Sequence, residues 1–398
     1  MATSWVQTGS LPTTARQFSW PPLGEGEIRL IRIPLTAAYH GIFDCGLEVI
    51  TADEIDSKKY AYQALSYAWG DTTPTRKIIC NGQPLWIHQN LYDALLAVCE
   101  SYRSNPRNSD RYYLATSDIR PGFRLWTDRI CIDQSNPVEK AVQIMRMGSI
   151  YGRAEGLIVW LGHSRLAYRI AAILSNIQKD GSTHSRKSDP LATVIGEASE
   201  DMRVFLAETS WFRRRWVVQE LLNVAPKDRW FMWGEYARPY SELYKAVKHC
   251  RLLEQAGCLR HGGWRSSGTY AGTMSRKTFA TDEPEAYPAE IEHILVPKVS
   301  LLENLHRFRA AECSLQHDRI FSLLSISDDD IPQGLIDYKE SVDTLYLAVA
   351  LIPNSTAERR IVSTFVGQTV IVVTVQTIAY TAFERSSFAK QRSWATEL

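Results

Sequence analysis

The order of apolar and polar positions predicts alternating strands and helices in the first half of the chain. Residues 62–68 and 157–161 are short apolar runs, which are typical of buried strands. Residues 124–130 predict another strand, and residues 138–151 carry apolar side chains at helical spacing. That helical face consists of Val138, Val142, Met145 and Ile150. Strand, helix and strand in this order predict a parallel sheet flanked by helices, and hence an α/β fold.

Turn signals predict further elements before and between these runs. Residues 1–59 form a leader whose segment IRLIRIPL predicts an edge strand. The dipeptide Asn81-Gly82 lies between two apolar segments and predicts a hairpin, because Asn-Gly is the strongest two-residue turn signal. A helix is expected over residues 89–102.

The second half of the chain is expected to be mainly helical. Ser210 is predicted to cap a helix over residues 212–224. Residues 176–199 and 257–288 are rich in Gly, Ser and Pro and are expected to form exposed, irregular segments. We therefore divide the chain after the leader into a main domain at 60–235, a helical region at 236–346, and a tail at 347–398 with no assigned fold.

The tail contains the one segment that is long enough to cross a membrane. Residues 361–383 carry no charge, and a span needs about 20 apolar residues. Gln368, Gln376 and the many Val, Ile and Thr residues favour strands instead. We therefore expect no membrane span.

Composition narrows the class of protein. The 45 Lys and Arg residues nearly balance the 44 Asp and Glu residues, so no strong field attracts nucleic acid or anionic lipid. The 7 Cys residues never form a CxxC pair, and the His residues lack metal-ligand spacing, so neither a disulfide framework nor a metal site is expected. The first residues lack the apolar run of a secretory signal, which predicts a cytoplasmic protein.

Several sequence blocks occur in a specific order between residues 64 and 220. They are ALSYAWGD from Ala64, the Asn81-Gly82 hairpin, Asn90-Leu91 with Ala94-Leu95, LWTDRICIDQ from Leu125 with VWLG from Val159, and WFRRRWVVQE from Trp211. Together they resemble the heterokaryon incompatibility (HET) domain of filamentous fungi. Residues 301–326 and 336–346 resemble the region that commonly follows that domain. The resemblance implies a role in non-self recognition and regulated cell death.

HET domains are similar in turn to TIR domains, whose enzymatic members cleave NAD. This weaker resemblance implies a TIR-like parallel sheet, NAD as a substrate with no cofactor, and Glu220 as the catalytic carboxylate. It also implies that substrate is bound by Tyr67, Trp69, Gly70, Asp71 and Trp216.

The residue types suit that chemistry. Trp216 and Glu220 are four residues apart, so one helical face would carry both an aromatic ring and a carboxylate. Cleavage of an N-glycosidic bond develops positive charge on the ribose, which a carboxylate can stabilise. Trp69 and Gly70 follow a predicted strand, at the end where open α/β sheets bind ligands.

Structural interpretations compete with these catalytic ones. Glu220 can instead pair with Arg213, Arg214 or Arg215 on a solvated helix face. The Trp residues can be core residues. Asp128 and Gln134 can hold loop backbone, and no role is assigned to Asp133. Cys131 with His163 as its base would suit a hydrolase, but a Cys at the end of an apolar strand is usually inert.

Three functional hypotheses follow. The first is an effector that hydrolyses NAD when clustered, and the second is a non-enzymatic adaptor that associates through surface helices. The third is an inactive family member. In the first two, we expect self-association and an unidentified protein trigger, and no nucleic-acid partner.

Overall fold

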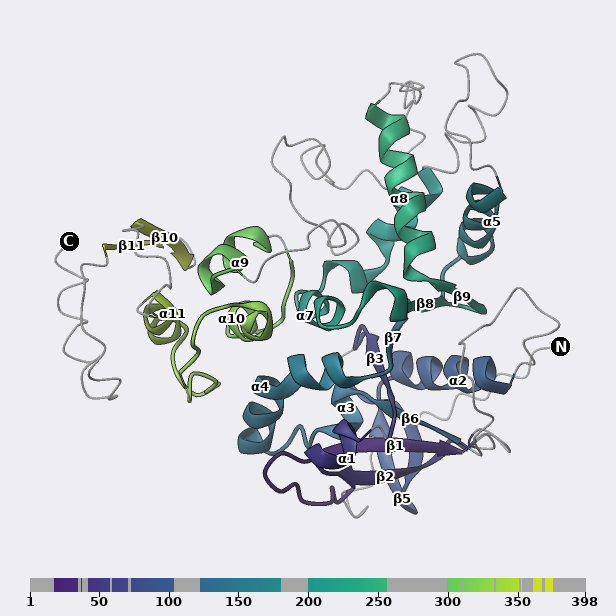
Figure 1. Ribbon diagram of the computed structural model, residues 1–398, viewed down its shortest axis with the longest axis horizontal. Helices are drawn as coiled ribbons and strands as arrows, with labels where there is room; N and C mark the ends of the chain where they lie inside the picture. The colour runs from purple at the N-terminus through teal and green to yellow at the C-terminus, as the bar shows by residue number, and fades with distance from the viewer. Residues whose placement is uncertain are drawn as a thin grey trace. The chain divides into compact units, whose positions relative to one another are not determined.

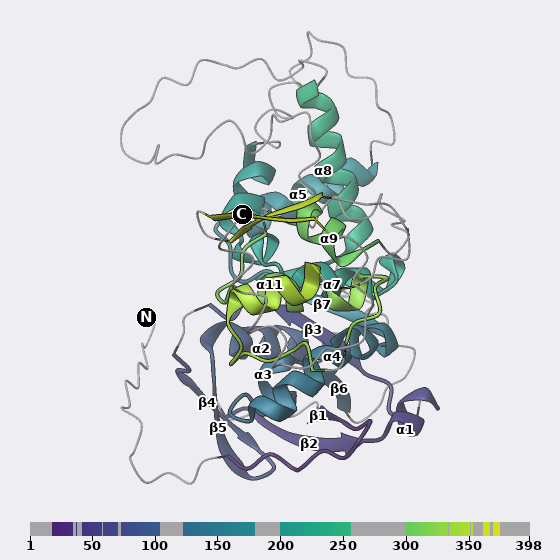
Figure 2. The ribbon, with the colours of Figure 1, turned by 90° about the vertical axis from the view of Figure 1, so that its left-hand side faces the viewer.

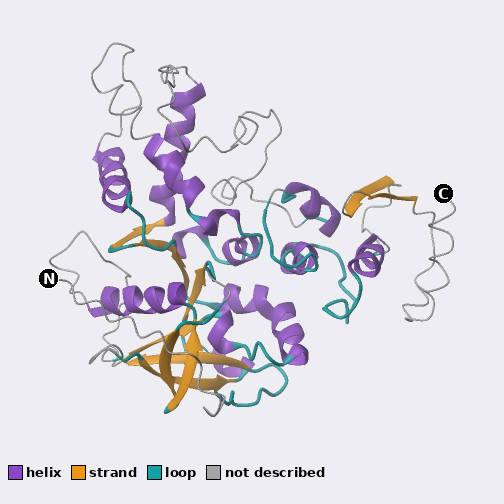
Figure 3. Cartoon of the chain, turned by 180° about the vertical axis from the view of Figure 1, so that it is seen from behind, coloured by secondary structure: helices purple, strands orange, loops and turns teal. Residues whose placement is uncertain are grey.

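The computed structural model describes residues 18–34, 37, 42–57, 59–70, 73–103, 122–179, 200–255, 299–309, 311–332, 334–350, 352, 361–366 and 369–374 (Figure 1). The chain divides into two compact units. The first comprises residues 1–134, 153–167 and 230–238, and the second comprises residues 135–152, 168–229 and 239–398. Strands dominate the first unit and helices dominate the second (Figure 3).

A nine-stranded mixed sheet is the centre of the first unit, in the order β5-β4-β2-β1-β6-β3-β7-β8-β9. The strands are β1 (Ile28–Pro34), β2 (Asp44–Ile50), β3 (Gln63–Tyr67), β4 (Arg76–Cys80), β5 (Gln83–Ile87), β6 (Gly122–Trp126), β7 (Gly156–Trp160), β8 (Arg229–Trp233) and β9 (Tyr236–Pro239). β3 runs parallel to both β6 and β7, with Gln63 opposite Leu125 and Gly156. The predicted α/β fold is therefore confirmed, with a parallel centre at β6, β3 and β7 and a short parallel pairing of β2 with β4.

The leader contributes two strands to this sheet, which lie side by side in Figure 2. The prediction of an edge strand is wrong, because β1 pairs antiparallel with β2 on one side and with β6 on the other. Ile28, Leu30, Ile31 and Ile33 are fully buried. Successive buried residues on both faces of β1 explain why the segment reads as a continuous apolar run.

The hairpin and the first long helix are confirmed. Asn81 and Gly82 have φ angles of 50° and 72°, as a tight turn between β4 and β5 requires. The Asn81 side chain also accepts a hydrogen bond from Leu47 N at 2.9 Å, which ties the turn to β2. Helix α2 (Gln89–Arg103) packs against β3 and buries Leu91, Ala94, Leu95 and Val98.

The predicted strand at 124–130 ends early. β6 stops at Trp126, and Asp128–Cys131 form the short helix α3, in which Cys131 N donates to Thr127 O at 2.9 Å. Ile130 and Cys131 are apolar and are buried on this helical turn. Their sequence therefore looks like a continuation of the buried strand. A short helix α1 (Ala52–Asp56) has a capping box between Thr51 and Glu54.

The second unit is mainly helical in its described residues, as expected for the region after 236. Its elements are α4 (Pro137–Arg153), α5 (Ala167–Lys179), η2 (Ser210–Arg213), α7 (Val217–Leu222), η3 (Pro226–Asp228), α8 (Tyr240–Gln255), α9 (Leu301–Arg307), α10 (Asp318–Phe321), η6 (Leu324–Ile326) and α11 (Val342–Ala350). A hairpin of β10 (Ile361–Val366) and β11 (Thr369–Thr374) follows.

The predicted helix at 212–224 is divided into two parts, and Ser210 is not its cap. Ser210 begins the 3₁₀ turn η2, which has no side-chain cap, and α7 begins only at Val217. The interruption has a tertiary cause, because Arg215 N donates to Glu312 O at 2.7 Å and Glu312 N donates to Arg213 O at 2.6 Å. These backbone groups are therefore withdrawn from helical pairing.

Helix α4 is confirmed, but its buried face is not the predicted one. Val138, Val142 and Met145 are 73%, 51% and 42% exposed, whereas Ile150 is buried. The buried face is formed instead by Gln143, Ile144, Met147, Gly148, Ile150 and Tyr151. Both faces are apolar, so periodicity alone does not distinguish the face that meets the core.

Other predicted segments lie wholly or partly outside the described residues. α5 continues to Lys179, and residues 180–199 and 256–298 are not described. The described part of the tail forms strands, as its composition favours, while residues 375–383 are not described. Among the helices that the structure does describe, none has the length and apolarity needed to cross a membrane.

Candidate functional site

The carboxyl end of β3 carries the first group of predicted site residues. Tyr67 is 2% exposed and so belongs to the core, while Trp69 is half-buried. Gly70 is exposed and has a φ of 74°, a conformation that favours glycine. Asp71 lies outside the described residues.

Trp69 is held in a fixed orientation by two neighbours. Its indole Nε1 donates to Asp128 Oδ2 at 2.9 Å, and its ring stacks on His88 with a centroid distance of 5.4 Å. Asp128 also accepts from Arg129 N at 2.7 Å, and its carbonyl accepts from Gln134 Nε2 at 2.9 Å. Asp128 and Gln134 therefore organise the loop after β6, and Asp128 links that loop to Trp69.

A second hydrogen-bond chain connects β3, α2 and β7. Asn90 Nδ2 donates to Ala68 O at 2.6 Å, and Trp160 Nε1 donates to Asn90 Oδ1 at 2.9 Å. His163 follows β7, packs edge-on against Trp160 at 5.4 Å and lies 3.8 Å from Asp93 Oδ2. Asn90 and Trp160 both lie in the sequence blocks described above, but nothing in the sequence marks them as partners.

These chains meet where an α/β sheet generally binds ligands. β6 and β7 lie on opposite sides of β3 and run parallel to it, so their carboxyl ends share one edge of the sheet. Ligands of open α/β sheets bind at such an edge, where the strand order reverses. Two hydrogen-bonded pairs, Trp69 with Asp128 and Asn90 with Trp160, therefore lie at this edge within the first unit.

Cys131 does not have the properties of a nucleophile. It is 1% exposed, and burial raises the pKa of its thiol to about 12. A nucleophilic Cys needs a lowered pKa, because the thiolate is the reactive form. The side chain of His163, its hypothetical base, is 69% exposed. Asp133 is half-buried beside this segment.

Trp216 and Glu220 belong to the second unit. Glu220 lies on α7 and is 4% exposed, so it is not on a solvated helix face. Arg213 instead pairs with Glu312 at 3.4 Å, and buried Arg215 donates to the carbonyls of Arg319, at 2.8 Å, and of Phe308. The predicted ion pair of Glu220 with Arg213 or Arg215 on a solvated helix face is therefore wrong.

Trp216 is anchored to a carboxylate, Asp318, that no sequence motif marks as a site residue. Asp318 on α10 is bonded by Trp216 and by Tyr338 Oη, the latter at 2.8 Å. Burial is the main influence on Asp318 and raises its pKa, while these two hydrogen bonds oppose the rise. Lys140 Nζ lies 4.4 Å from the centroid of the Tyr338 ring. This cluster joins α4, α7 and α10 within the second unit.

The structure thus groups the predicted residues into two sets. Trp69, Asp128 and Gln134 lie together in the first unit, while in the second Trp216 immediately precedes α7 and Glu220 lies on it. A shared site formed by Trp69 and Glu220 stays a prediction. Among the described residues, no group of His, Cys, Asp and Glu side chains could hold a metal ion.

The fold is α/β, and comparison with known proteins shows which family part of the chain is similar to. Residues 62–220 match the model of the family described as Heterokaryon incompatibility protein (HET). The chain therefore contains a segment that matches this family. It is also similar to Heterokaryon incompatibility protein 6, OR allele, of Neurospora crassa, with 28% identity over 232 residues. That match covers 50% of this chain and 32% of the relative, and no solved structure matches the chain.

Proposed function

We propose that this chain acts in fungal incompatibility, the response to fusion between unlike cells, and that the response ends in regulated death of the fused cell. The HET domain and the incompatibility protein of Neurospora crassa support this role. The cytoplasm is the proposed compartment, because the described cysteines are free thiols.

The proposed activity is hydrolysis of NAD. Water adds to C1′ of the nicotinamide ribose while the N-glycosidic bond breaks. Nicotinamide leaves with the electron pair of that bond, and the water gives up a proton to solvent. The other product is ADP-ribose. Because nicotinamide leaves as a neutral base, one carboxylate that stabilises charge on the ribose is sufficient.

The burial of Glu220 is the observation that carries this proposal. The residue is 4% exposed, and a carboxylate acts more strongly on a developing positive charge where water is excluded. In this proposal, Glu220 is the catalytic residue.

The test compares NAD consumption by the purified wild-type chain and by Glu220→Gln, over a range of protein concentrations. We expect the wild type to release nicotinamide and ADP-ribose, and Glu220→Gln to be slower by about a hundredfold or more. Glu208→Gln is the matched control, because Glu208 is an exposed glutamate in the same unit. It should keep wild-type activity.

Folding must be measured alongside activity, because Glu220 is buried. Thermal unfolding of Glu220→Gln within a few degrees of the wild type would assign the loss of activity to chemistry. If the folded wild type consumes no NAD at any concentration, including concentrations at which it associates, the enzymatic proposal is wrong.

A non-enzymatic adaptor is the second candidate, and one observation favours it. Val138, Val142 and Met145 expose apolar side chains on α4, which is typical of a protein-binding surface. In that case Glu220→Gln would leave cell death intact, provided that the variant folds.

A further inference from the structure

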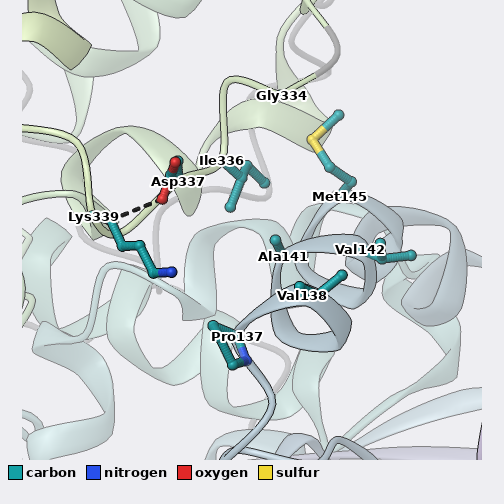
Figure 4. A pocket seen from close by; sticks show the side chains of 9 residues that line it. All are labelled: Pro137, Val138, Ala141, Val142, Met145, Gly334, Ile336, Asp337 and Lys339. Carbon is teal, nitrogen blue, oxygen red and sulfur yellow. Dashed lines mark hydrogen bonds between the residues drawn. The ribbon is translucent and has the colours of Figure 1, made fainter.

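Helix α4 presents an exposed apolar face beside a groove (Figure 4). Val138, Val142 and Met145 form this face, and each is more than 40% exposed. The groove has a volume of about 390 Å³ and lies between α4 and the segment that contains Ile336. Both walls belong to the second unit. Large apolar side chains in such an arrangement mark a surface that binds another protein.

The charged residues beside this face have a self-complementary arrangement. Glu139 and Arg146 are seven residues apart, so they lie about two turns apart along the same edge of α4. Both are half-buried at the border of the apolar face. In an antiparallel pair of α4 helices related by a two-fold axis near Val142, this edge of one helix lies beside the same edge of the other helix, and the two edges run in opposite directions. Glu139 of each copy then lies opposite Arg146 of the other.

We infer that α4 is a self-association surface, on which a second copy of this chain docks its own α4 in antiparallel orientation. Val142 lies near the two-fold axis, and Val138 of each copy meets Met145 of the other. Two Glu139–Arg146 ion pairs border the apolar contact on one edge. The interface is isologous, since each copy uses the same surface.

The small size of the surface defines how strong the association is. Stable complexes bury about 800 Å² per partner, and one helix face of three large apolar side chains provides less than that. The dimer is therefore weak and forms when copies are concentrated. Such a contact responds to clustering by another molecule, because a high local concentration replaces intrinsic affinity.

Sedimentation velocity of the purified chain over a dilution series tests the apolar contact. The wild type should shift from monomer towards dimer as its concentration rises. Val142→Arg should remain monomeric over the same series, because it places two positive charges at the two-fold axis. Tyr168→Arg is the control, since Tyr168 is 73% exposed on α5 and should not affect the association.

Charge reversal tests the antiparallel geometry. Glu139→Arg alone places two positive charges at each ion pair, and Arg146→Glu alone places two negative charges there. Each variant should dimerise about tenfold more weakly than the wild type. An equimolar mixture of the two variants should regain wild-type affinity, because each ion pair of the mixed dimer then joins Arg to Glu.

Three results would overturn the inference. They are a wild type that stays monomeric through the series, a Val142→Arg variant that associates like the wild type, and a mixture that dimerises no better than its components. Thermal unfolding of each variant shows whether it is folded. None of these measurements involves NAD, so they stand apart from the test of the proposed enzymatic activity.

Discussion

Tyr338 donates a hydrogen bond of 2.8 Å to Asp318, and the same carboxylate is bonded by Trp216. Asp318 is 9% exposed, so its hydrogen bonds replace most of the water that it would otherwise bind. Lys140 lies over the Tyr338 ring and adds a cation–π contact. A residue that follows the HET domain by more than a hundred positions therefore helps to fix helices α4 and α7.

Removal of the Tyr338 hydroxyl should destabilise the second unit. Tyr338→Phe keeps the ring but leaves Asp318 with one fewer donor, which should lower the free energy of unfolding by about 1–3 kcal/mol. Urea denaturation followed by circular dichroism measures the difference. Tyr168→Phe, a change at an exposed tyrosine, is the control and should stay within about 0.5 kcal/mol of the wild type. An unchanged midpoint for Tyr338→Phe would contradict the structural role.

The raised pKa of Asp318 predicts a pH dependence of stability. A carboxyl group whose pKa is higher in the folded state favours folding while it is protonated. That contribution is complete below its ordinary pKa of 3.8 and is lost as the pH rises through the folded-state pKa. Asp318→Asn cannot ionise, so its stability relative to the wild type should increase with pH from about 4 to 7. A stability difference that is constant over this range would contradict the prediction.

Asn90 should stabilise the first unit by linking the end of β3 to β7 through its side-chain hydrogen bonds. Asn90→Ala removes the hydrogen bonds to Ala68 and Trp160 and should cost about 2–3 kcal/mol. Trp160→Phe removes the indole donor together with part of a buried ring, so it also has a packing cost of its own. In a double-mutant cycle, the two changes should cost less together than the sum of the single changes, because they share one bond. Full additivity would show that the Asn90–Trp160 bond contributes nothing to stability.

Gly148 should not tolerate alanine, although it lies within helix α4. Alanine generally stabilises a helix interior relative to glycine by about 1 kcal/mol. At this position, however, its Cβ would lie 2.3 Å from Ser325 Cβ, so Gly148→Ala should lower stability by about 1–3 kcal/mol. Gly152→Ala is the matched control, because its Cβ would meet only Asn223 O at 3.3 Å. If α4 and the segment around Ser325 do not pack together, Gly148→Ala should be more stable than Gly152→Ala.

The Cys131 thiol should be protected from alkylation in the native protein. It is buried, and its raised pKa leaves almost no thiolate at neutral pH. Brief iodoacetamide treatment followed by peptide mass spectrometry should label half-buried Cys313 before Cys131. Labelling of both should occur after unfolding in urea. Rapid native labelling of Cys131 would reopen the nucleophile hypothesis.

The parallel centre of the sheet could be predicted because its signals are local. β3 and β7 are apolar runs, and Asn81-Gly82 specifies its turn by backbone conformation alone. The position of β1 could not be predicted, since pairing on both sides depends on β2 and β6. The break before α7 has the same origin, because it results from backbone pairing with Glu312.

The candidate site was predicted only in part, for a similar reason. Trp69 and Asp128 were identified from their sequence blocks, but their hydrogen bond joins residues 59 positions apart. Asp318 and Tyr338 carry no motif that marks them as partners of Trp216. The exposure of Val142 was missed because helical spacing identifies an apolar face without identifying what covers it.

The contacts of Arg215 limit how this gene can be rearranged. The family match ends at residue 220, yet the buried guanidinium of Arg215 is bonded to the carbonyls of Phe308 and Arg319. A recombination event that joined residues 62–220 to a new sensor would leave that cation without its acceptors. A gene rearrangement that keeps the fold should therefore carry residues 62–220 together with the segment that contains Phe308 and Arg319.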